Sequence, residues 1–428
     1  MSSFNSIEDV SCTTFNILAP IYKRLSCESR ESEFRETWLS RNESILDRLL
    51  NLRSSIICLQ EFWIGNEELV SMYRRRLNDA GYVIYELART NNRGDGLLTA
   101  LHRQHFDVLN YKELLFHDFG DRVAQLLHVD LVTDISTNDD NNLKMEALIV
   151  NTHLLFPHNS GCCLHRLQQV YKILQFIESY CEEYQLPPLP IILCGDWNGS
   201  KNGHVYKFLR SQGFVSSYDI AHHYADDDLD SPKWVSHRNH RGNICGVDFI
   251  WLLNPNNPRK PLKESFMEAV LGNIKNHLSK TSIESTGHLQ LKTKFTYSSH
   301  ITYNQFCQAL VELGLTSEFH DGLSAEKIKD MWDYVDTDGD GVIDLAHFDI
   351  VLNSPSYQQR DDDSNEDTDI QRETWPDKSR ISTTLGFDVK NAVLFPPEVE
   401  QGNWPESYSL SDHAHLTVAF APTMLFIT

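Results

Sequence analysis

The stretch 191–200, IILCGDWNGS, limits the folds open to this chain more than any other. Its apolar residues follow a proline-rich turn at 186–190, which is typical of a strand buried on both faces in an α/β protein. Asp196 and Asn198 come directly after that strand, where open α/β sheets bind their ligands. An ordinary turn after a buried strand would have the same sequence pattern. The residues at the other strand ends are therefore needed to distinguish a ligand site from a turn.

Several other apolar runs also end in polar side chains. The run at 54–62 reaches Glu61 near its end, and the run at 146–152 leads into His153. Asp248 lies inside the apolar run 245–253, where a carboxylate needs a partner because burying it unpaired is costly. The complete set of candidate residues at strand ends is Asn16, Glu61, His153, Asp196, Asn198, Asp248, Asp412 and His413.

These residue types together predict a hydrolytic site. Glu61, Asn16 and Asp412 supply the hard oxygen ligands that Mg²⁺ or Mn²⁺ prefers. Asp248 is expected to fix the tautomer of His413 and to leave a base poised near neutral pH. No Ser or Cys nucleophile with a base of its own is evident, so water is the expected nucleophile. A hard metal with histidine and carboxamide donors suits attack on phosphorus.

Composition indicates a globular chain with room for two domains, since its 428 residues are 41% hydrophobic and 23% charged. We expect no signal peptide, because the N-terminus has no basic region followed by an apolar one, and no membrane span, because no stretch approaches the ~20 apolar residues required. The nine cysteines lack CxxC spacing, which predicts reduced thiols, no disulfide partner and a cytoplasmic or nuclear location. The net charge of −22 argues against a broad basic surface for polyanions, although bound cations leave a phosphate substrate open.

A change in composition divides the chain. The α/β pattern runs over 10–256, and 257–360 is then helical and polar. An acidic segment at 361–381 reads as a solvated linker, and strand-like sequence returns over 382–428. The pattern predicts a core built from the first and last parts, with a helical domain inserted between them.

The predicted insert carries DTDGDGVIDLAHF at 336–348, which has the spacing of a calcium loop. Its first, third and fifth positions are aspartates, but His347 stands at position twelve, where such loops place a bidentate Glu. We therefore expect weak Ca²⁺ binding, or a loop that keeps its fold without binding. The predicted ligands are Asp336, Asp338, Asp340, Val342, Asp344 and His347.

Calcium loops pair through a short β-contact at position eight. The stretch 301–306 fits the exit half of a degenerate partner loop, with Ile301 opposite Ile343. An ordinary helix start at 301–306 fits the residues equally well. The residues before Ile301 offer no carboxylates, so a partner loop would be free of metal.

The blocks TFNILAP, CLQEF, RGDGLL, NTHL, GDWNG, GVDFIWL and LSDH, in this order, resemble the signature of the endonuclease/exonuclease/phosphatase superfamily. TFNILAPIY and GDWNGSKNGHVYKFL most resemble its deadenylase-like branch, which includes nocturnin, and the inserted loop resembles plant members with an EF-hand. The resemblance implies an α/β (α+β) fold. This is a four-layer DNase I-like sandwich of two packed mixed β-sheets flanked by helices, with an inserted all-α EF-hand-like domain.

The resemblance also implies which residues contact the metal and the substrate. Glu61 would be the principal Mg²⁺ ligand with Asn16 beside it, and Asp412 would contact metal or water. Arg122 and Asp95 are weaker candidates for substrate contact, and Asp95 also fits a turn former.

Catalytic roles follow from the same likeness. His153 would hold the scissile phosphate, Asp196 would orient or activate the attacking water, and Asn198 would stabilise the transition state. Asp248 would orient His413, which could serve as a base or as a stabiliser of phosphate charge.

Three functions remain open from the sequence. The first is a Mg²⁺-dependent phosphodiester hydrolase acting on RNA as a 3′ exonuclease or deadenylase-like enzyme, with a calcium-binding EF-hand insert. The second is a phosphatase or phosphodiesterase for a small phosphoester or lipid headgroup. The third is a calcium-responsive binding protein with a vestigial catalytic core, against which His347 and the complete set of site residues both count.

Overall fold

The computed structural model describes residues 8–118, 120–132, 145–157, 162–201, 203–225, 234–284, 300–312, 316, 324–336, 339–344 and 382–427. The chain separates into two units. One unit comprises Met1–Ala269 and Thr384–Leu425, and the other comprises Val270–Thr383 and Phe426–Thr428.

The first unit contains two six-stranded mixed sheets. In the first sheet the strand order is β15-β16-β1-β2-β4-β3, with β1 parallel to β2 and antiparallel to β16. Its strands are β1 (Val10–Asn16), β2 (Ile56–Phe62), β3 (Tyr82–Ala88), β4 (Gly96–His102), β15 (Ser382–Phe395) and β16 (His415–Ile427). The last two come from the C-terminal part of the chain, so the sheet joins distant segments of sequence.

In the second sheet the order is β5-β6-β7-β8-β12-β9, with β7 parallel to β8 and the other neighbouring strands antiparallel. Its strands are β5 (Phe106–Leu115), β6 (Val123–Leu131), β7 (Glu146–His153), β8 (Ile191–Asp196), β9 (Val215–Ser216) and β12 (Asp248–Leu253). The short strands β10 (His237–Arg238) and β11 (Ile244–Cys245) form a separate pair.

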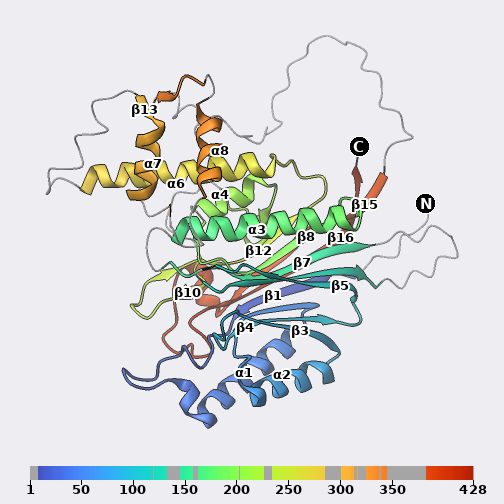
Figure 1. Ribbon diagram of the computed structural model, residues 1–428. Coiled ribbons are helices and arrows are strands. Elements are labelled where there is room, and N and C mark those ends of the chain that lie inside the picture. Colours follow the sequence, from blue (N-terminus) through green and yellow to red (C-terminus); the bar gives the residue numbers. More distant parts are fainter. Residues whose placement is uncertain are drawn as a thin grey trace. The chain divides into compact units, whose positions relative to one another are not determined.

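Helices cover the outer faces of both sheets (Figure 1). α1 (Arg35–Leu52) and α2 (Glu67–Asp79) pack their buried apolar side chains against β1, β2 and β4. α3 (Cys162–Glu183) lies over β5, β6 and β7 of the second sheet. The remaining helices of this unit are α4 (His204–Ser211), α5 (Ser217–Ala221), η1 (Glu31–Glu33), η3 (Pro397–Gln401) and the start of α6 (Leu262–Glu284). Two packed mixed sheets flanked by helices confirm this part of the expected fold.

Polar side chains lie between the two sheets, just behind the strand ends. Gln60 donates to Asn151 Oδ1 (2.8 Å), and Asn151 donates to the Leu59 carbonyl (3.2 Å). Thr99 donates to Gln125 Oε1 (2.7 Å) in the same region. Because a buried amide without partners is costly, this network fixes how one sheet faces the other.

The described part of the second unit has helices and one small sheet. It contains the rest of α6, α7 (Tyr303–Glu312) and α8 (Ala325–Val335), with β13 (His300–Thr302) antiparallel to β14 (Val342–Asp344). Ile301 pairs with Ile343, which confirms the predicted β-contact. Trp332 packs against Tyr303, with ring centroids 5.3 Å apart. The EF-hand fold of this unit stays a prediction.

The start of the predicted calcium loop is held by hydrogen bonds to the side chain of Asp336. Its Oδ2 accepts hydrogen bonds from the Gly341 backbone (3.2 Å) and from Trp332 Nε1 (2.9 Å). Asp340 Oδ1 accepts from the Val342 backbone (2.9 Å). Asp338, His347 and the acidic linker at 361–381 lie outside the described residues.

All nine cysteines are free thiols. Among the described helices, none is both long and apolar enough to cross a membrane.

Candidate active site

Three catalytic candidates stand in one row across the second sheet. His153 ends β7 and pairs with Asp196 at the end of β8, and Asp196 pairs with Asp248 at the start of β12. Gly195 allows this close approach, because a Cβ atom there would lie 1.9 Å from the Thr152 carbonyl oxygen. The apolar strands therefore deliver three polar side chains to the same edge.

The first sheet brings its own polar residues to that edge. Asn16 ends β1, and Glu61 lies in β2 with a left-handed φ of 54° at a bulge against β4. Asn16 Nδ2 donates both to Glu61 Oε1 (3.2 Å) and to Asp196 Oδ2 (3.0 Å). One buried amide thus connects the carboxylates of the two sheets.

His413 reaches the row from the segment before β16. Its Nδ1 bonds to Asp248 Oδ2 (2.9 Å), and its Nε2 lies 3.7 Å from Asp196 Oδ2. Burial opposes the charge on His413, but Asp248 and Asp196 outweigh it and raise the pKa to about 10. This differs from the base near neutral pH expected from sequence, because two carboxylates rather than one act on the ring.

The pKa of His153 is shifted in the opposite direction to that of His413. Burial, together with the positive charges of Arg122 and Arg89, lowers the pKa of His153 well below its ordinary value. Its Nε2 lies 3.3 Å from Asp196 Oδ2. A neutral imidazole here can donate one hydrogen bond and accept another.

Asn198 is fixed by the loop after β8 rather than by the strand. It has a left-handed φ of 48°, and its backbone N–H donates to Asp196 Oδ1 (2.9 Å). Its side-chain nitrogen donates to the Leu154 carbonyl (3.0 Å), which ties the loop to the segment after His153. One N–H of the carboxamide is therefore committed to the protein.

The two weaker candidates differ from each other. Asp95 is buried and accepts from Tyr22 Oη (2.7 Å) and Arg89 Nη1 (3.0 Å), as expected of a structural anchor rather than a substrate contact. Arg122 is also buried, directly before β6, and its Nε and Nη1 have no hydrogen-bond partner among the described residues.

A model of the Endonuclease/Exonuclease/phosphatase family matches residues 13–277, which is more than half of the 428-residue chain. The chain belongs to this family. The match ends before Asp412 and His413, which the fold adds to the endonuclease/exonuclease/phosphatase site from the C-terminal part of the chain.

Curated relatives fall into two groups. A protein of Arabidopsis thaliana, named as an uncharacterized calcium-binding protein, is 54% identical over 420 residues, or 97% of this chain and 85% of that protein. Carbon catabolite repressor protein 4 homolog 3 of the same plant is 30% identical over 176 residues, covering 41% of this chain and 36% of that protein. Protein angel of Drosophila melanogaster is 25% identical, covering 40% of this chain and 47% of that protein.

Solved structures of the family resemble the chain more distantly. The 2′,3′-cyclic phosphatase ANGEL2 is 17% identical with a TM-score of 0.44, covering 58% of this chain and 85% of that one. The human Nocturnin catalytic domain is 19% identical with a TM-score of 0.42, covering 57% of this chain and 82% of that one.

The side of the site that faces Glu61 fits a divalent cation. Burial among protein atoms, then the negative charges of Asp412 and Asp95, raise the pKa of Glu61 to about 7. A cluster of carboxylate oxygens whose negative charge the surrounding protein does not neutralise suits Mg²⁺. Asn16, however, turns its nitrogen toward Glu61, while its oxygen accepts from the Leu18 backbone (3.1 Å). In this orientation Asn16 bridges carboxylates rather than offering a metal ligand.

Four further side chains belong to the site but were not predicted. Ser236 donates to Asp248 Oδ2 (2.6 Å), and the His237 ring stacks on His413 with centroids 4.2 Å apart. Arg166 and Arg89 face the end of β7 from α3 and from the loop after β3. SHRNH at 236–240 is polar and not preceded by an apolar run, so the rule that found the other residues overlooks it.

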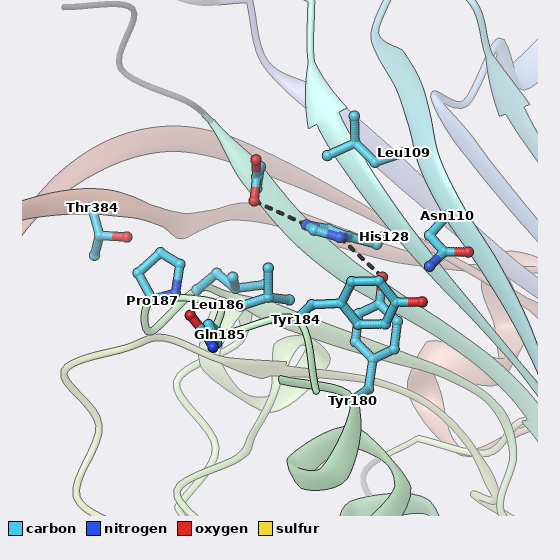
Figure 2. A pocket seen from close by; sticks show the side chains of 11 residues that line it. Leu109, Asn110, His128, Tyr180, Tyr184, Gln185, Leu186, Pro187 and Thr384 are labelled. Atoms are coloured by element: carbon cyan, nitrogen blue, oxygen red, sulfur yellow. Dashed lines mark hydrogen bonds and ion pairs between the residues drawn. The ribbon is translucent and has the colours of Figure 1, made fainter. Parts of the chain in front are cut away.

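A hollow of about 480 Å³ lies elsewhere in the first unit, around the start of β7 (Figure 2). His128 bonds there to Tyr180 Oη (3.1 Å) and to Glu146 Oε2 (3.0 Å). Glu146 begins the strand that His153 ends, so the hollow and the row of catalytic candidates lie at opposite ends of β7. Among the described residues, its lining includes none of the predicted site residues.

Proposed function

We propose that the protein is a Mg²⁺-dependent phosphodiester hydrolase that degrades RNA from the 3′ end. The observation that carries this proposal is the position of Asp196. Its Oδ2 accepts from Asn16 and lies within 3.3 Å of His153 Nε2 and 3.7 Å of His413 Nε2. A carboxylate at the junction of both sheets, between two imidazoles, is placed to orient a water beside a phosphoryl group.

Each remaining residue has a role that its contacts support. Asp248 and Ser236 hold His413 in one orientation, so that Nε2 points toward Asp196. His153 donates to a phosphoryl oxygen, and Asn198 stabilises the charge that develops there. Glu61, with Asp412 beside it, would hold the Mg²⁺, which supplies Lewis-acid stabilisation of phosphoryl charge when bound.

Two candidate substrates are supported by different observations. RNA is favoured by the likeness of TFNILAPIY and GDWNGSKNGHVYKFL to the deadenylase-like branch. A small phosphoester or lipid headgroup is the second candidate, because a net charge of −22 repels a long polyanion. The spacing of the nine cysteines supports a cytoplasmic or nuclear location as part of the same proposal.

Weak binding of Ca²⁺ by the second unit is part of this proposal. It is supported by the aspartate spacing and by the name of the relative that is 54% identical, a calcium-binding protein. The carboxylate of Asp336 already accepts from the Gly341 backbone, as the start of a calcium loop requires.

The salt dependence of RNA binding tests which substrate class is correct. Asp196→Asn should block turnover and allow binding of an adenylate oligomer to be measured from 50 to 200 mM salt in Mg²⁺. Contacts with several phosphates predict that log K falls with log salt at about −0.7 per contact, so three contacts give a slope near −2. A flat dependence, with turnover of a small phosphoester by the wild type, would replace RNA by the second candidate.

A further inference from the structure

Three buried side chains around the end of β7 carry nitrogen atoms with no partner. Arg122 is 7% exposed and leaves Nε and Nη1 unpaired among the described residues. Arg166 is 8% exposed and leaves Nε unpaired, and His153 is 5% exposed and leaves Nδ1 unpaired. Buried polar atoms are nearly always satisfied in folded proteins, so the three unpaired guanidinium nitrogens of Arg122 and Arg166 call for a hydrogen-bond acceptor.

The two guanidinium groups reach the segment 152–155 from different elements, Arg122 from the residue before β6 and Arg166 from α3. Ala124 pairs with Thr152, and Thr152 Oγ1 donates to the Val123 carbonyl (3.1 Å), which places Arg122 beside the end of β7. From α3, Arg166 Nη1 donates to the Leu155 carbonyl (3.3 Å). A Cβ atom on Gly199 would lie 3.8 Å from Arg166 Nε, so Arg166 also borders the loop after Asp196.

The unpaired guanidinium nitrogens are costly to bury because each guanidinium group carries a positive charge. A guanidinium group does not give up its proton in a protein, so burial leaves a charge that must be compensated. Arg89 also lies in this region, but Asp95 neutralises it at 3.0 Å. Asp95, Glu61 and Asp196 act on Arg122 through space, and Asp196 acts on Arg166 in the same way, but the unpaired nitrogens have no carboxylate partner among the described residues. The site therefore has a carboxylate side at Glu61 and a cationic side at Arg122 and Arg166.

We propose that Arg122 and Arg166, beside the end of β7, form an anion subsite that binds a dianionic phosphoryl group without help from the metal. Guanidinium groups present paired N–H donors that match phosphate oxygens, and two of them balance two negative charges. A phosphodiester carries one charge and a phosphomonoester carries two, so the subsite prefers a terminal phosphate, such as that of a released nucleotide. The inference rests on the proposed phosphoester hydrolysis for the source of the anion, but its binding is measured separately.

Phosphorus NMR or calorimetric titration in EDTA measures this binding directly. The ligands are inorganic phosphate, adenosine 5′-monophosphate and dimethyl phosphate, a monoanionic diester. We expect the wild type to bind the first two more tightly than the third. We expect Arg122→Gln and Arg166→Gln each to weaken phosphate at least tenfold. Arg76→Gln is the matched control, because it removes one positive charge from a surface pair with Asp47.

Thermal unfolding separates binding from folding. Removing an uncompensated buried charge should leave the Tm of Arg122→Gln unchanged or raise it, and phosphate should raise the Tm of the wild type but not of the variant. Arg122→Lys keeps the charge but loses the planar fork, and it should bind phosphate with intermediate affinity.

Three binding results and one unfolding result would each refute the proposed subsite. Equal phosphate affinity in wild type and Arg122→Gln, no binding in EDTA, or equal affinity for dimethyl phosphate would overturn the subsite. A large fall in the Tm of phosphate-free Arg122→Gln would assign Arg122 to structure instead. RNA hydrolysis is scored independently, so intact RNA with normal phosphate binding refutes the proposed substrate and leaves the subsite standing.

Discussion

Arg41 of α1 ties together the two loops that deliver the site. Its Nη1 donates to the carbonyls of Ile17 (2.7 Å) and Leu410 (2.7 Å), and its Nη2 donates to Leu18 (2.8 Å). Its Nε donates to both carboxylate oxygens of Glu31 at 2.9 Å. The first loop follows Asn16 and the second precedes Asp412, so one side chain sets the distance between the two strand ends.

Arg41→Met tests this role. The substitution leaves Glu31, which is 1% exposed, without its bidentate partner. Breaking a buried ion pair by removing one partner costs about 3–5 kcal/mol in free energy of unfolding. Lys23 Nζ lies 3.4 Å from Glu31 and retains part of the compensation, so we expect a loss near 3 kcal/mol. Urea unfolding followed by tryptophan fluorescence measures it.

A double-mutant cycle identifies the cause. In a Glu31→Leu background, Arg41→Met should cost less by about 2 kcal/mol or more, because no buried carboxylate is left behind. The kcat should fall in both Arg41 variants, since the two loops lose their common donor. A loss below 1 kcal/mol for Arg41→Met, or the same loss in both backgrounds, would refute the clamp.

Three other predictions follow from particular residues. Asp248→Asn should lower kcat by ~10² or more with little change in KM, because the neutral amide no longer stabilises the charged His413 ring; steady-state kinetics with near-wild-type kcat would contradict it. Burial, then the charge of Arg48, lowers the pKa of His415 to about 3, below its unfolded value of 6.5. The unfolded state therefore takes up the proton first, and about 2 kcal/mol of stability should be lost from pH 7 to pH 5, a loss that unfolding curves of His415→Gln should lack. His347→Glu should tighten Ca²⁺ binding in a calorimetric titration, and submicromolar affinity in the wild type would contradict weak binding.

The strand ends could be predicted because burial and charge conflict within a few residues of sequence. Glu61, Asp196 and Asp248 each stand in or next to an apolar run, where an unpaired carboxylate is costly. A buried carboxylate needs a charged or hydrogen-bonding partner. The second sheet brings such groups together by placing His153, Asp196 and Asp248 in one register.

Other features of the site depend on neighbours that only the fold brings together. His413 is charged because carboxylates from β8 and β12 both act on it, and the sequence pairs it with one of them. Asn16 donates toward Glu61 because the Leu18 backbone occupies its oxygen. Arg166 lies on α3, and only the fold brings it to the segment after β7, where its Nη1 donates to the Leu155 carbonyl.

Hydrolysis of 5′-labelled RNA with an adenylate tail is the decisive measurement for the proposed metal-dependent ribonuclease activity. The reactions are wild type with Mg²⁺, wild type with EDTA, and His413→Ala with Mg²⁺, with thermal unfolding to show that the variant is folded. We predict a ladder of shortened products that requires Mg²⁺, with kcat lowered by ~10²–10⁴ in the variant. Intact RNA under every condition, or equal turnover by His413→Ala, would contradict it.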